Sequence, residues 1–558
     1  MSSVGCTITL ALCLIALAAT QAKSVLRQDI GIRDPFIYCD AATGRCYMYG
    51  TCGTVDGKRG FDVRETSDPT LQTWSDRKPA FRSPEGFWGV WAYWAPEVFR
   101  YKDKYYLFST FEAPGRARAV QILAADSPAG PFHVHSPQPL TGPEYFSLDG
   151  TLYIDKKGDP WMVYSREHVS VHDGQMRAMR LKPDLTAPID GTDILLFKAS
   201  SASYAAHWQT KSGEPGYLTD GPQMLRLSDG GLVMAWSTNN YLPHPIGWGY
   251  TVSIARSESG EVQGPWVQEG ILYNGFAGHG QIFRHPSLGL VLSVHQPNNR
   301  GRPYPLFLHV YEDKGKLTMA EPSPNYVQAY WRFEDCTPGH TVLPSIDIID
   351  SSGKSNHLRG DDFGSVGTAS SDVAAGRIPA TSRPNLFCYD NAQAPKDAAA
   401  RFLHTVDKPI NKLALTTWTV EASIHPSDMS KPHVFLCREP DLSLGLNSDG
   451  RLELRFKGQS ITSRAAVTAG KWCNLAAVCD GRRIRIYIDS IDGKGFVLDT
   501  SALLLAKATE LSKGQWIVGC GMRDGKPVDQ FYGLIDEVRI SNKALIPGSL
   551  LFARKAGR

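Results

Sequence analysis

The sequence lacks a strong net charge, a metal-binding cysteine pattern and any long apolar run after its first 22 residues. Its 59 Lys and Arg against 56 Asp and Glu leave a charge of +3, too weak a field to favour nucleic acid or an acidic membrane surface. No later segment approaches the roughly 18 consecutive apolar residues of a membrane-spanning helix. No CxxC pair occurs among the 11 cysteines, and their spacings match no zinc site. We therefore expect neither a nucleic-acid-binding protein nor a membrane span.

The first 22 residues are expected to be a signal peptide that is not part of the fold. No charge occurs before Lys23, the stretch 6–19 is largely apolar, and Thr20-Gln-Ala22 places small residues where a signal peptidase reads them. This predicts a secreted or periplasmic protein, in a compartment that permits disulfides. Cys39 and Cys46 flank the turn 40–44, so we expect a hairpin cross-link there, while the pairing of the other cysteines stays open.

One sequence pattern recurs five times in the first 320 residues. An acidic residue or a histidine opens a short apolar run, a turn follows, and an apolar-aromatic strand ends mostly in Ser or Thr. The openings lie 63, 52, 71 and 59 residues apart and are Asp34, Glu97, Asp149, Asp220 and His279. That period fits one four-stranded sheet, a unit that cannot bury its own faces, and it therefore predicts a five-bladed β-propeller.

A second domain is expected because 558 residues are too many for one hydrophobic core. The repeats end near Tyr311, the Pro-rich segment 321–324 reads as a linker, and the later strands alternate with the period of 2 that is typical of a two-sheet sandwich. No helical period is sustained. The sequence thus predicts an all-β fold with a signal peptide at 1–22, a five-bladed β-propeller at 23–320 and a β-sandwich of the jelly-roll type at 326–558.

A propeller brings the openings of its repeats to one mouth of the central channel, and three carboxylates there suggest acid–base chemistry on a sugar. Each Asp-Gly or Asp-Pro dipeptide alone is more often an ordinary turn, so the repeated position carries the argument. Asp149 would raise the pKa of a neighbouring carboxylic acid, because two carboxyl groups close together in a cleft repel each other when both are ionised. Arg33 is expected to keep Asp34 ionised.

The N-terminal region resembles glycoside hydrolase family 43, over about residues 28–315. The motifs that carry this resemblance are Arg33-Asp-Pro35, Trp94-Ala-Pro-Glu-Val98, Leu148-Asp-Gly-Thr151, Thr219-Asp-Gly-Pro222, Gly278-His-Gly280 and His295-Gln-Pro-Asn298. The C-terminal region is similar to laminin-G-like, concanavalin-type jelly rolls. Its motifs are Tyr330-Trp-Arg-Phe333, the segment 350–357 and Gly533-Leu-Ile-Asp-Glu-Val-Arg-Ile540.

The family resemblance implies a role for each carboxylate. Asp34 would be the general base, Asp149 would orient and tune the acid, and Asp220 would be the acid, in place of the Glu that is commoner in that motif. Glu214 is the substitute candidate for the acid. In similar propellers a histidine at the position of His279 coordinates an axial metal, commonly calcium. The alternative is a hydrogen-bonded histidine that fills the channel.

Trp91 and Trp94 belong to an aromatic cluster just ahead of the second repeat, which we interpret as a sugar-stacking wall, although core packing is the alternative for any one ring. Glu97 is expected to orient substrate or to pack at the channel. Arg166 ends a strand near the expected pocket and is a further candidate for substrate binding.

The resulting hypothesis is an exo-acting, inverting glycosidase that hydrolyses arabinose- or xylose-containing oligosaccharides or polysaccharides, either an α-L-arabinofuranosidase or a β-xylosidase. One alternative is a related propeller glycosidase that acts on galactan or another glycan. The other is a non-catalytic lectin, which the Asp at position 220 favours. The second domain would bind carbohydrate or brace the propeller. The linkage cleaved and the oligomeric state stay open.

Overall fold

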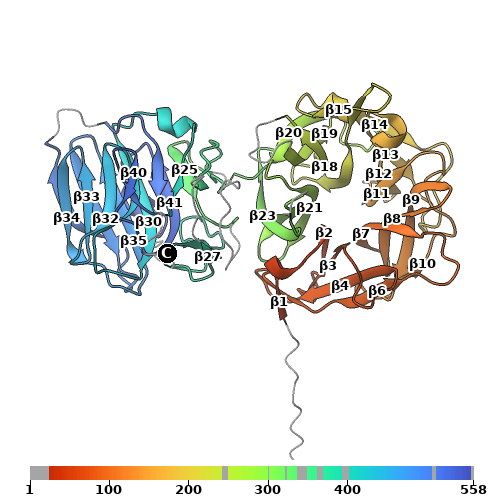
Figure 1. Cartoon of the computed structure of the whole chain (residues 1–558), viewed down its shortest axis with the longest axis horizontal. Helices are drawn as coiled ribbons and strands as arrows, with labels where there is room; N and C mark the ends of the chain where they lie inside the picture. The colour runs from red at the N-terminus through yellow and green to blue at the C-terminus, as the bar shows by residue number, and fades with distance from the viewer. Residues whose placement is uncertain are drawn as a thin grey trace, which may run out of the picture.

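The computed structural model describes residues 24–241, 249–298, 301–320, 323–335, 348–360, 368–392, 401–505 and 510–553. The predicted signal peptide lies outside these residues. Within them, no helix has the length and apolar character needed to cross a membrane. Nearly all regular structure is β, in a propeller and a sandwich (Figure 1). The predicted all-β fold class is therefore confirmed.

The propeller consists of five four-stranded antiparallel blades (Figure 1). Blade 1 contains β2 (Arg33–Cys39), β3 (Cys46–Thr51), β4 (Gly60–Thr66) and β6 (Lys78–Arg82). Blade 2 contains β7 (Trp91–Tyr101), β8 (Lys104–Ala113), β9 (Arg116–Ala125) and β10 (His133–Val134). Blade 3 contains β11 (Ser147–Ile154), β12 (Pro160–Arg166), β13 (Gln175–Arg180) and β14 (Ile194–Lys198).

The last two blades follow the same order from the channel outward. Blade 4 contains β17 (Asp220–Arg226), β18 (Leu232–Asn240), β19 (Gly249–Ser257) and β20 (Trp266–Tyr273). Blade 5 contains β21 (Gly278–His285), β22 (Gly289–Gln296), β23 (Tyr304–Asp313) and β24 (Lys316–Thr318). Smaller elements outside the blade sheets are β1 (Ser24–Leu26) paired with β5 (Thr73–Ser75), the helix α1 (His168–Val171) between β12 and β13, and the hairpin of β15 (His207–Gln209) and β16 (Pro215–Tyr217) between blades 3 and 4.

Each blade's innermost strand begins with the same β-bulge. The register slips by one residue at this point in all five strands, and the bulged residue has a positive φ, as bulges of this kind require. The bulged residues are Asp34 (52°), Ala95 (45°), Asp149 (55°), Gly221 (47°) and His279 (52°). Each is followed by Pro or Gly. The sequence repeat predicted equivalent positions for Asp34, Glu97, Asp149, Asp220 and His279. Two of them are not at the bulge: Glu97 lies two residues after the bulged Ala95, and Asp220 lies one residue before the bulged Gly221.

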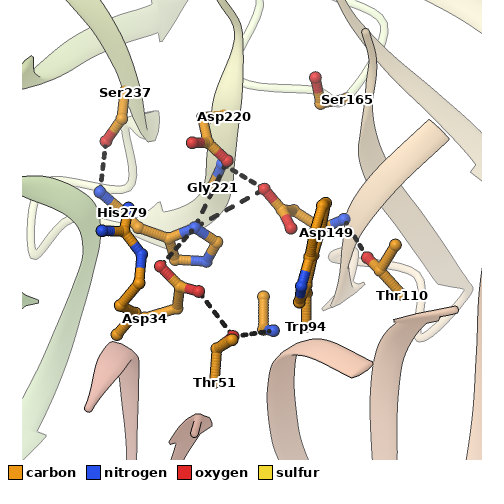
Figure 2. Close-up of polar contacts among 12 residues, drawn as sticks. Asp34, Thr51, Trp94, Thr110, Asp149, Ser165, Asp220, Gly221, Ser237 and His279 are labelled. Carbon is orange, nitrogen blue, oxygen red and sulfur yellow. Dashed lines mark hydrogen bonds and ion pairs between the residues drawn. The ribbon is translucent and has the colours of Figure 1, made fainter. Parts of the chain in front are cut away.

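A side chain of the preceding blade accepts a hydrogen bond from each of the five bulges. In four blades the acceptor is a Ser, Thr or His near the end of that preceding blade's second strand (Figure 2). The pairs are Ala95 to Thr51 Oγ1 (2.8 Å), Asp149 to Thr110 Oγ1 (3.0 Å), His279 to Ser237 Oγ (2.9 Å) and Asp34 to His295 Nδ1 (3.2 Å). Blade 4 differs, since Gly221 N–H donates to Asp149 Oδ2 at 3.0 Å.

The ring closes without a strand shared between its first and last blades. The Gln281 side chain accepts from Ile37 N–H (2.6 Å) and donates to Ile37 O (2.9 Å), which joins blade 5 to blade 1. Gln223 bonds Ile282 in the same way, at 2.6 and 3.0 Å. Ahead of blade 1, the buried Arg27 donates to the Pro305 carbonyl at 2.9 Å. The predicted cross-link of the first hairpin, Cys39–Cys46, is confirmed.

The C-terminal part is a two-layer sandwich around one apolar core that contains Trp331, Trp418 and Trp516. One sheet has the order β27 (Thr368–Ser370), β28 (Cys388–Asp390), β41 (Gly533–Ser541), β30 (Trp418–Pro426), β35 (Cys473–Cys479), β36 (Arg483–Asp489) and β37 (Val497–Leu503), with β25 (Val327–Trp331) also on β41. The other has the order β26 (Arg359–Gly360), β29 (Leu403–His404), β38 (Trp516–Val518), β31 (His433–Arg438), β32 (Leu442–Leu446), β33 (Arg451–Phe456) and β34 (Gln459–Ala466).

Candidate active site

Three carboxylates from three blades surround one imidazole at the mouth of the propeller channel (Figure 2). His279 Nδ1 lies 3.6 Å from Asp34 Oδ1, 3.6 Å from Asp149 Oδ2 and 3.4 Å from Asp220 Oδ1. Asp149 and His279 are only 3% and 8% exposed. The structure thus brings together Asp34, Asp149, Asp220 and His279, four of the residues that open the sequence repeats. Asp220 belongs to this cluster although it lies one residue before the bulge of its blade.

Asp34 is held in its ionised form. Burial alone would raise its pKa, but the charge of His279, the contact with His295 (3.2 Å) and a 2.6 Å hydrogen bond from Thr51 Oγ1 lower that pKa well below its ordinary value. Arg33, which we expected to have this effect, instead donates to Asn298, at 2.6 Å to its carbonyl and 2.8 Å to Oδ1. An ionised Asp34 can accept a proton from water, as a general base must.

Asp149 and Asp220 are interacting carboxyl groups whose pKa values shift in opposite directions. Burial and the charge of Asp220 raise the pKa of Asp149 well above its ordinary value. Burial opposes ionisation of Asp220 as well, but hydrogen bonds from Asp149, His279 and Tyr250 outweigh it and lower the pKa of Asp220. These opposite shifts favour the protonated form of Asp149 and the ionised form of Asp220.

His279 is a cation in this setting. Burial disfavours its charge, but the carboxylates of Asp149, Asp34 and Asp220 raise its pKa well above the ordinary value. Atoms of Asp149, Asp220 and His279 lie within 4.8 Å of one another, the spacing of a metal site. Calcium prefers about six to eight oxygen ligands. This set offers one imidazole and two carboxyl groups, and an ion bound there would have to displace the proton of that carboxyl pair. These three groups do not fit calcium.

Glu97 lies further along its inner strand than the carboxylate cluster and is 5% exposed. Burial raises its pKa to about 8, against the smaller opposing effects of the nearby Thr151 side chain and of the charge of His279. It occupies the same place in blade 2 as Gln223 in blade 4 and Gln281 in blade 5. This placement agrees with the packing alternative for Glu97 and leaves little of the side chain for a substrate to touch.

The two predicted tryptophans lie on the rim. Trp91 is 46% exposed and Trp94 is 38% exposed, and the guanidinium of Arg118 lies 4.8 Å from the centre of the Trp94 ring. Arg166 lies 4.2 Å from the centre of the Tyr145 ring, with Nη2 3.3 Å from Asp193. The tryptophans offer apolar faces to a sugar, whereas the described contacts of Arg166 turn it toward Asp193 rather than toward the carboxylates.

The second candidate acid, Glu214, is exposed in the turn of the β15–β16 hairpin, where its carbonyl accepts from Thr210. None of its described contacts involves the carboxylate cluster. Three residues of the cluster were missed by sequence reasoning: Thr51, Tyr250 and His295. The polar strand ends that include Thr51 and His295 were visible in the repeat, but nothing in the sequence marks Tyr250.

Acidic side chains of several blades and exposed tryptophans around the mouth of a five-bladed propeller define a carbohydrate-active enzyme. The chain belongs to glycosyl hydrolases family 43, whose family model matches residues 24–317. Residues 404–549 match the concanavalin A-like lectin/glucanases superfamily. Both predicted resemblances are confirmed, and the protein is a glycoside hydrolase.

The chain is similar to several solved structures. An endo-arabinase from Bacteroides thetaiotaomicron VPI-5482 is 37% identical over 52% of this chain and 98% of its own, with a TM-score of 0.48. An endo-1,4-beta-xylanase from the same organism is 24% identical (52% and 94% coverage, TM-score 0.41). An alpha-L-arabinofuranosidase from Lactobacillus brevis is 15% identical (54% and 99%, TM-score 0.41). A comparison with curated proteins finds no match.

Proposed function

We propose that this glycoside hydrolase is a secreted, exo-acting and inverting enzyme that releases arabinose or xylose from oligosaccharides or polysaccharides, as an α-L-arabinofuranosidase or a β-xylosidase. The observation that carries the proposal is the cluster of Asp34, Asp149 and Asp220 around His279. An ionised carboxylate and a carboxyl pair that shares a proton are the two groups that inverting hydrolysis needs.

In the proposed reaction, Asp34 takes a proton from water as the water oxygen attacks the anomeric carbon. The bond from that carbon to the glycosidic oxygen breaks, and Asp220 gives the leaving oxygen the proton that it receives from Asp149. Asp34 ends protonated and Asp149 ends ionised, so Asp34 returns its proton to solvent and Asp149 takes one up from solvent before the next turnover. Trp94 would stack on the sugar ring beside the cluster.

The exo mode draws support from the helix α1 of blade 3 and the hairpin between blades 3 and 4. The hairpin β15–β16 packs against α1 through His168, whose ring centre lies 4.7 Å from that of Trp208. Burial lowers the pKa of His168, and the charge of Asp220 acts in the opposite direction. The helix α1 and the hairpin therefore form a wall near the carboxylate cluster. A wall on one side of the mouth would admit a chain end rather than the middle of a chain.

The test is turnover of aryl arabinofuranosides, xylosides and galactosides by the wild type, Asp34→Asn, Asp220→Asn and the matched control Glu214→Gln. We expect losses of about 10²–10⁴-fold in the first two variants only. Loss in Glu214→Gln with full activity in Asp220→Asn would reassign the acid. If the wild type hydrolyses none of the aryl glycosides and none of the glycans that it binds, the protein is instead a lectin.

Stereochemistry needs its own measurement. Asp34 Oδ1 and Asp220 Oδ1 lie 3.6 and 3.4 Å from the same nitrogen, so they are at most 7.0 Å apart. This bound reaches only the lower end of the roughly 6.5–9.5 Å range of inverting enzymes. Product NMR that showed a retained anomeric configuration would contradict the inverting mechanism.

Two accessory roles belong to the proposal. Calcium, if bound through His279, would use Nε2 after that nitrogen loses its proton, because Nδ1 faces the carboxylates. Chelation should then lower the midpoint of thermal unfolding, and an unchanged midpoint would contradict calcium binding.

The second domain would brace the propeller, since the Arg383 guanidinium lies 4.5 Å from the centre of the Tyr311 ring. Replacing Arg383 with Ala should lower propeller stability while leaving KM unchanged.

A further inference from the structure

Asp220 is tethered by a residue that no motif contains. Tyr250, in the third strand of blade 4, is 2% exposed, and its hydroxyl donates to Asp220 Oδ2 at 2.5 Å. The other oxygen, Oδ1, lies 3.4 Å from His279 Nδ1. Both oxygens of the carboxyl group are therefore engaged, and its rotation about the bond to Cβ is fixed.

The position of Tyr250 is itself fixed by its surroundings. A Cβ atom at Gly278 would lie 2.2 Å from Tyr250 Cε1, so only glycine at position 278 leaves room for the ring. On the blade 5 side, the ring of His295 lies 5.9 Å away, centre to centre, at 33°. The Tyr250 carbonyl accepts from Ala277 N–H at 3.1 Å. The hydroxyl thus reaches Asp220 from a rigid base.

The contact also limits the length of the side chain at position 220. One additional methylene extends a carboxyl group by about 1.5 Å, and the Tyr250 hydroxyl is already at the short end of hydrogen-bond distances from Asp220. A glutamate in the same direction would collide with that hydroxyl. The tyrosine therefore occupies space that the commoner glutamate of this motif would need.

We propose that Tyr250 is the positioning residue that allows an aspartate to serve as the acid in this chain, by aiming the Asp220 carboxyl group and by filling the space of the missing methylene. The inference rests on the proposed function, in which Asp220 is the acid. Tyr250 does not touch substrate, because it is buried. Its removal should therefore change kcat and leave KM nearly unaltered.

A double-mutant cycle at positions 220 and 250 tests this inference. We expect Tyr250→Phe to lower kcat about 10- to 100-fold and Asp220→Glu to lower it at least as far. The double variant should recover kcat above Asp220→Glu alone, because phenylalanine vacates the place of the hydroxyl. Tyr49→Phe is the matched control, since Tyr49 is also buried and its hydroxyl donates to the Pro128 carbonyl rather than to a residue of the cluster. It should keep the wild-type kcat.

A wild-type kcat in Tyr250→Phe, or a double variant whose loss equals the product of the two single losses, would overturn the inference. If Tyr250→Phe folds poorly, Gly278→Ala supplies the second variant, because its Cβ displaces the ring; it should lower kcat at unchanged KM, and a wild-type kcat would again overturn the inference. Full activity in Asp220→Asn would refute the proposed function itself. Loss in Asp220→Asn with a neutral Tyr250→Phe would refute only the role of Tyr250.

Discussion

Replacement of Glu97 by glutamine should stabilise the propeller at alkaline pH and leave it nearly unchanged in acid. Glu97 holds the place of Gln223 and Gln281, which each exchange two hydrogen bonds with the backbone of the next blade. Glutamine can do the same at any pH. A carboxyl group can do so only while it keeps its proton, and Glu97 Oε2 has no hydrogen-bond partner among the described residues.

The magnitude follows from the raised pKa of Glu97. Burial moves it from an ordinary 4.5 to about 8, a difference that corresponds to about 5 kcal/mol. Because the pKa of the folded state is the higher one, the stabilisation is complete below pH 4.5 and is lost as the pH rises through about 8. Between pH 5 and pH 9 the wild type should lose about 4 kcal/mol through this residue, and Glu97→Gln should lose none of it.

The assay is urea unfolding of the wild type and Glu97→Gln at pH 5, 7 and 9. The two proteins should have similar midpoints at pH 5 and diverge as the pH rises, with the variant the more stable. Glu85→Gln, an exposed carboxylate of the same domain, should follow the wild type at every pH. Parallel pH profiles for Glu97→Gln and the wild type would show that Glu97 is ionised in the fold and would refute the argument.

Two further predictions concern the first blade and the rim. Replacing Cys39 and Cys46 together with serine should destabilise the propeller by about 2–3 kcal/mol, the value for closing a loop with a sequence separation of 7, and reduction of the wild type should match it in urea unfolding. Trp94→Ala should raise KM for an oligosaccharide about tenfold with a smaller effect on kcat, because a stacking face is lost; a larger loss in kcat than in KM would place Trp94 among the groups that act on the transition state.

The fold and the identity of the three carboxylates could be predicted from sequence because they rest on repetition. Five segments of similar length, each with a polar opening, force a ring, and a ring brings its openings together. The three Asp side chains do meet His279 at the channel mouth. No single motif of the five would have supported this conclusion, since Asp-Gly dipeptides are common turns.

The predicted equivalence of the repeat positions is wrong in two blades because it follows the acidic side chains and not the backbone bulge. The conserved feature within the chain is a left-handed residue followed by Pro or Gly, which places Ala95 and Gly221 at the bulges of blades 2 and 4. Alignment on that dipeptide would have put Glu97 beside Gln223 and Gln281. It would then have predicted a channel-packing residue rather than a contact with substrate.

The groups that tune the cluster could not be predicted, because their partners are distant in sequence. His295 lies 261 residues from Asp34, and Tyr250 lies 30 residues from Asp220 on a different strand. Arg33, the neighbour that sequence reasoning favoured, points toward Asn298. Adjacent residues of a strand face opposite sides, so proximity along the chain is a poor guide to which charge an aspartate senses.

Blade 4 is the one blade whose bulge N–H donates to a carboxylate, and it lies where the proposed chemistry requires two unlike carboxyl groups. Equivalent aspartates at the bulges of blades 3 and 4 would have equivalent backbone positions and similar surroundings. With Gly221 at the bulge instead, its N–H donates to Asp149 rather than to a hydroxyl, and the carboxylate moves to Asp220, one residue earlier. In the proposed mechanism, Asp149 is the buried partner whose raised pKa favours its protonated form, while Asp220, tethered by Tyr250, is the partner that delivers the proton. In that mechanism, the asymmetry needed to pass one proton in one direction arises from a single glycine in the repeat.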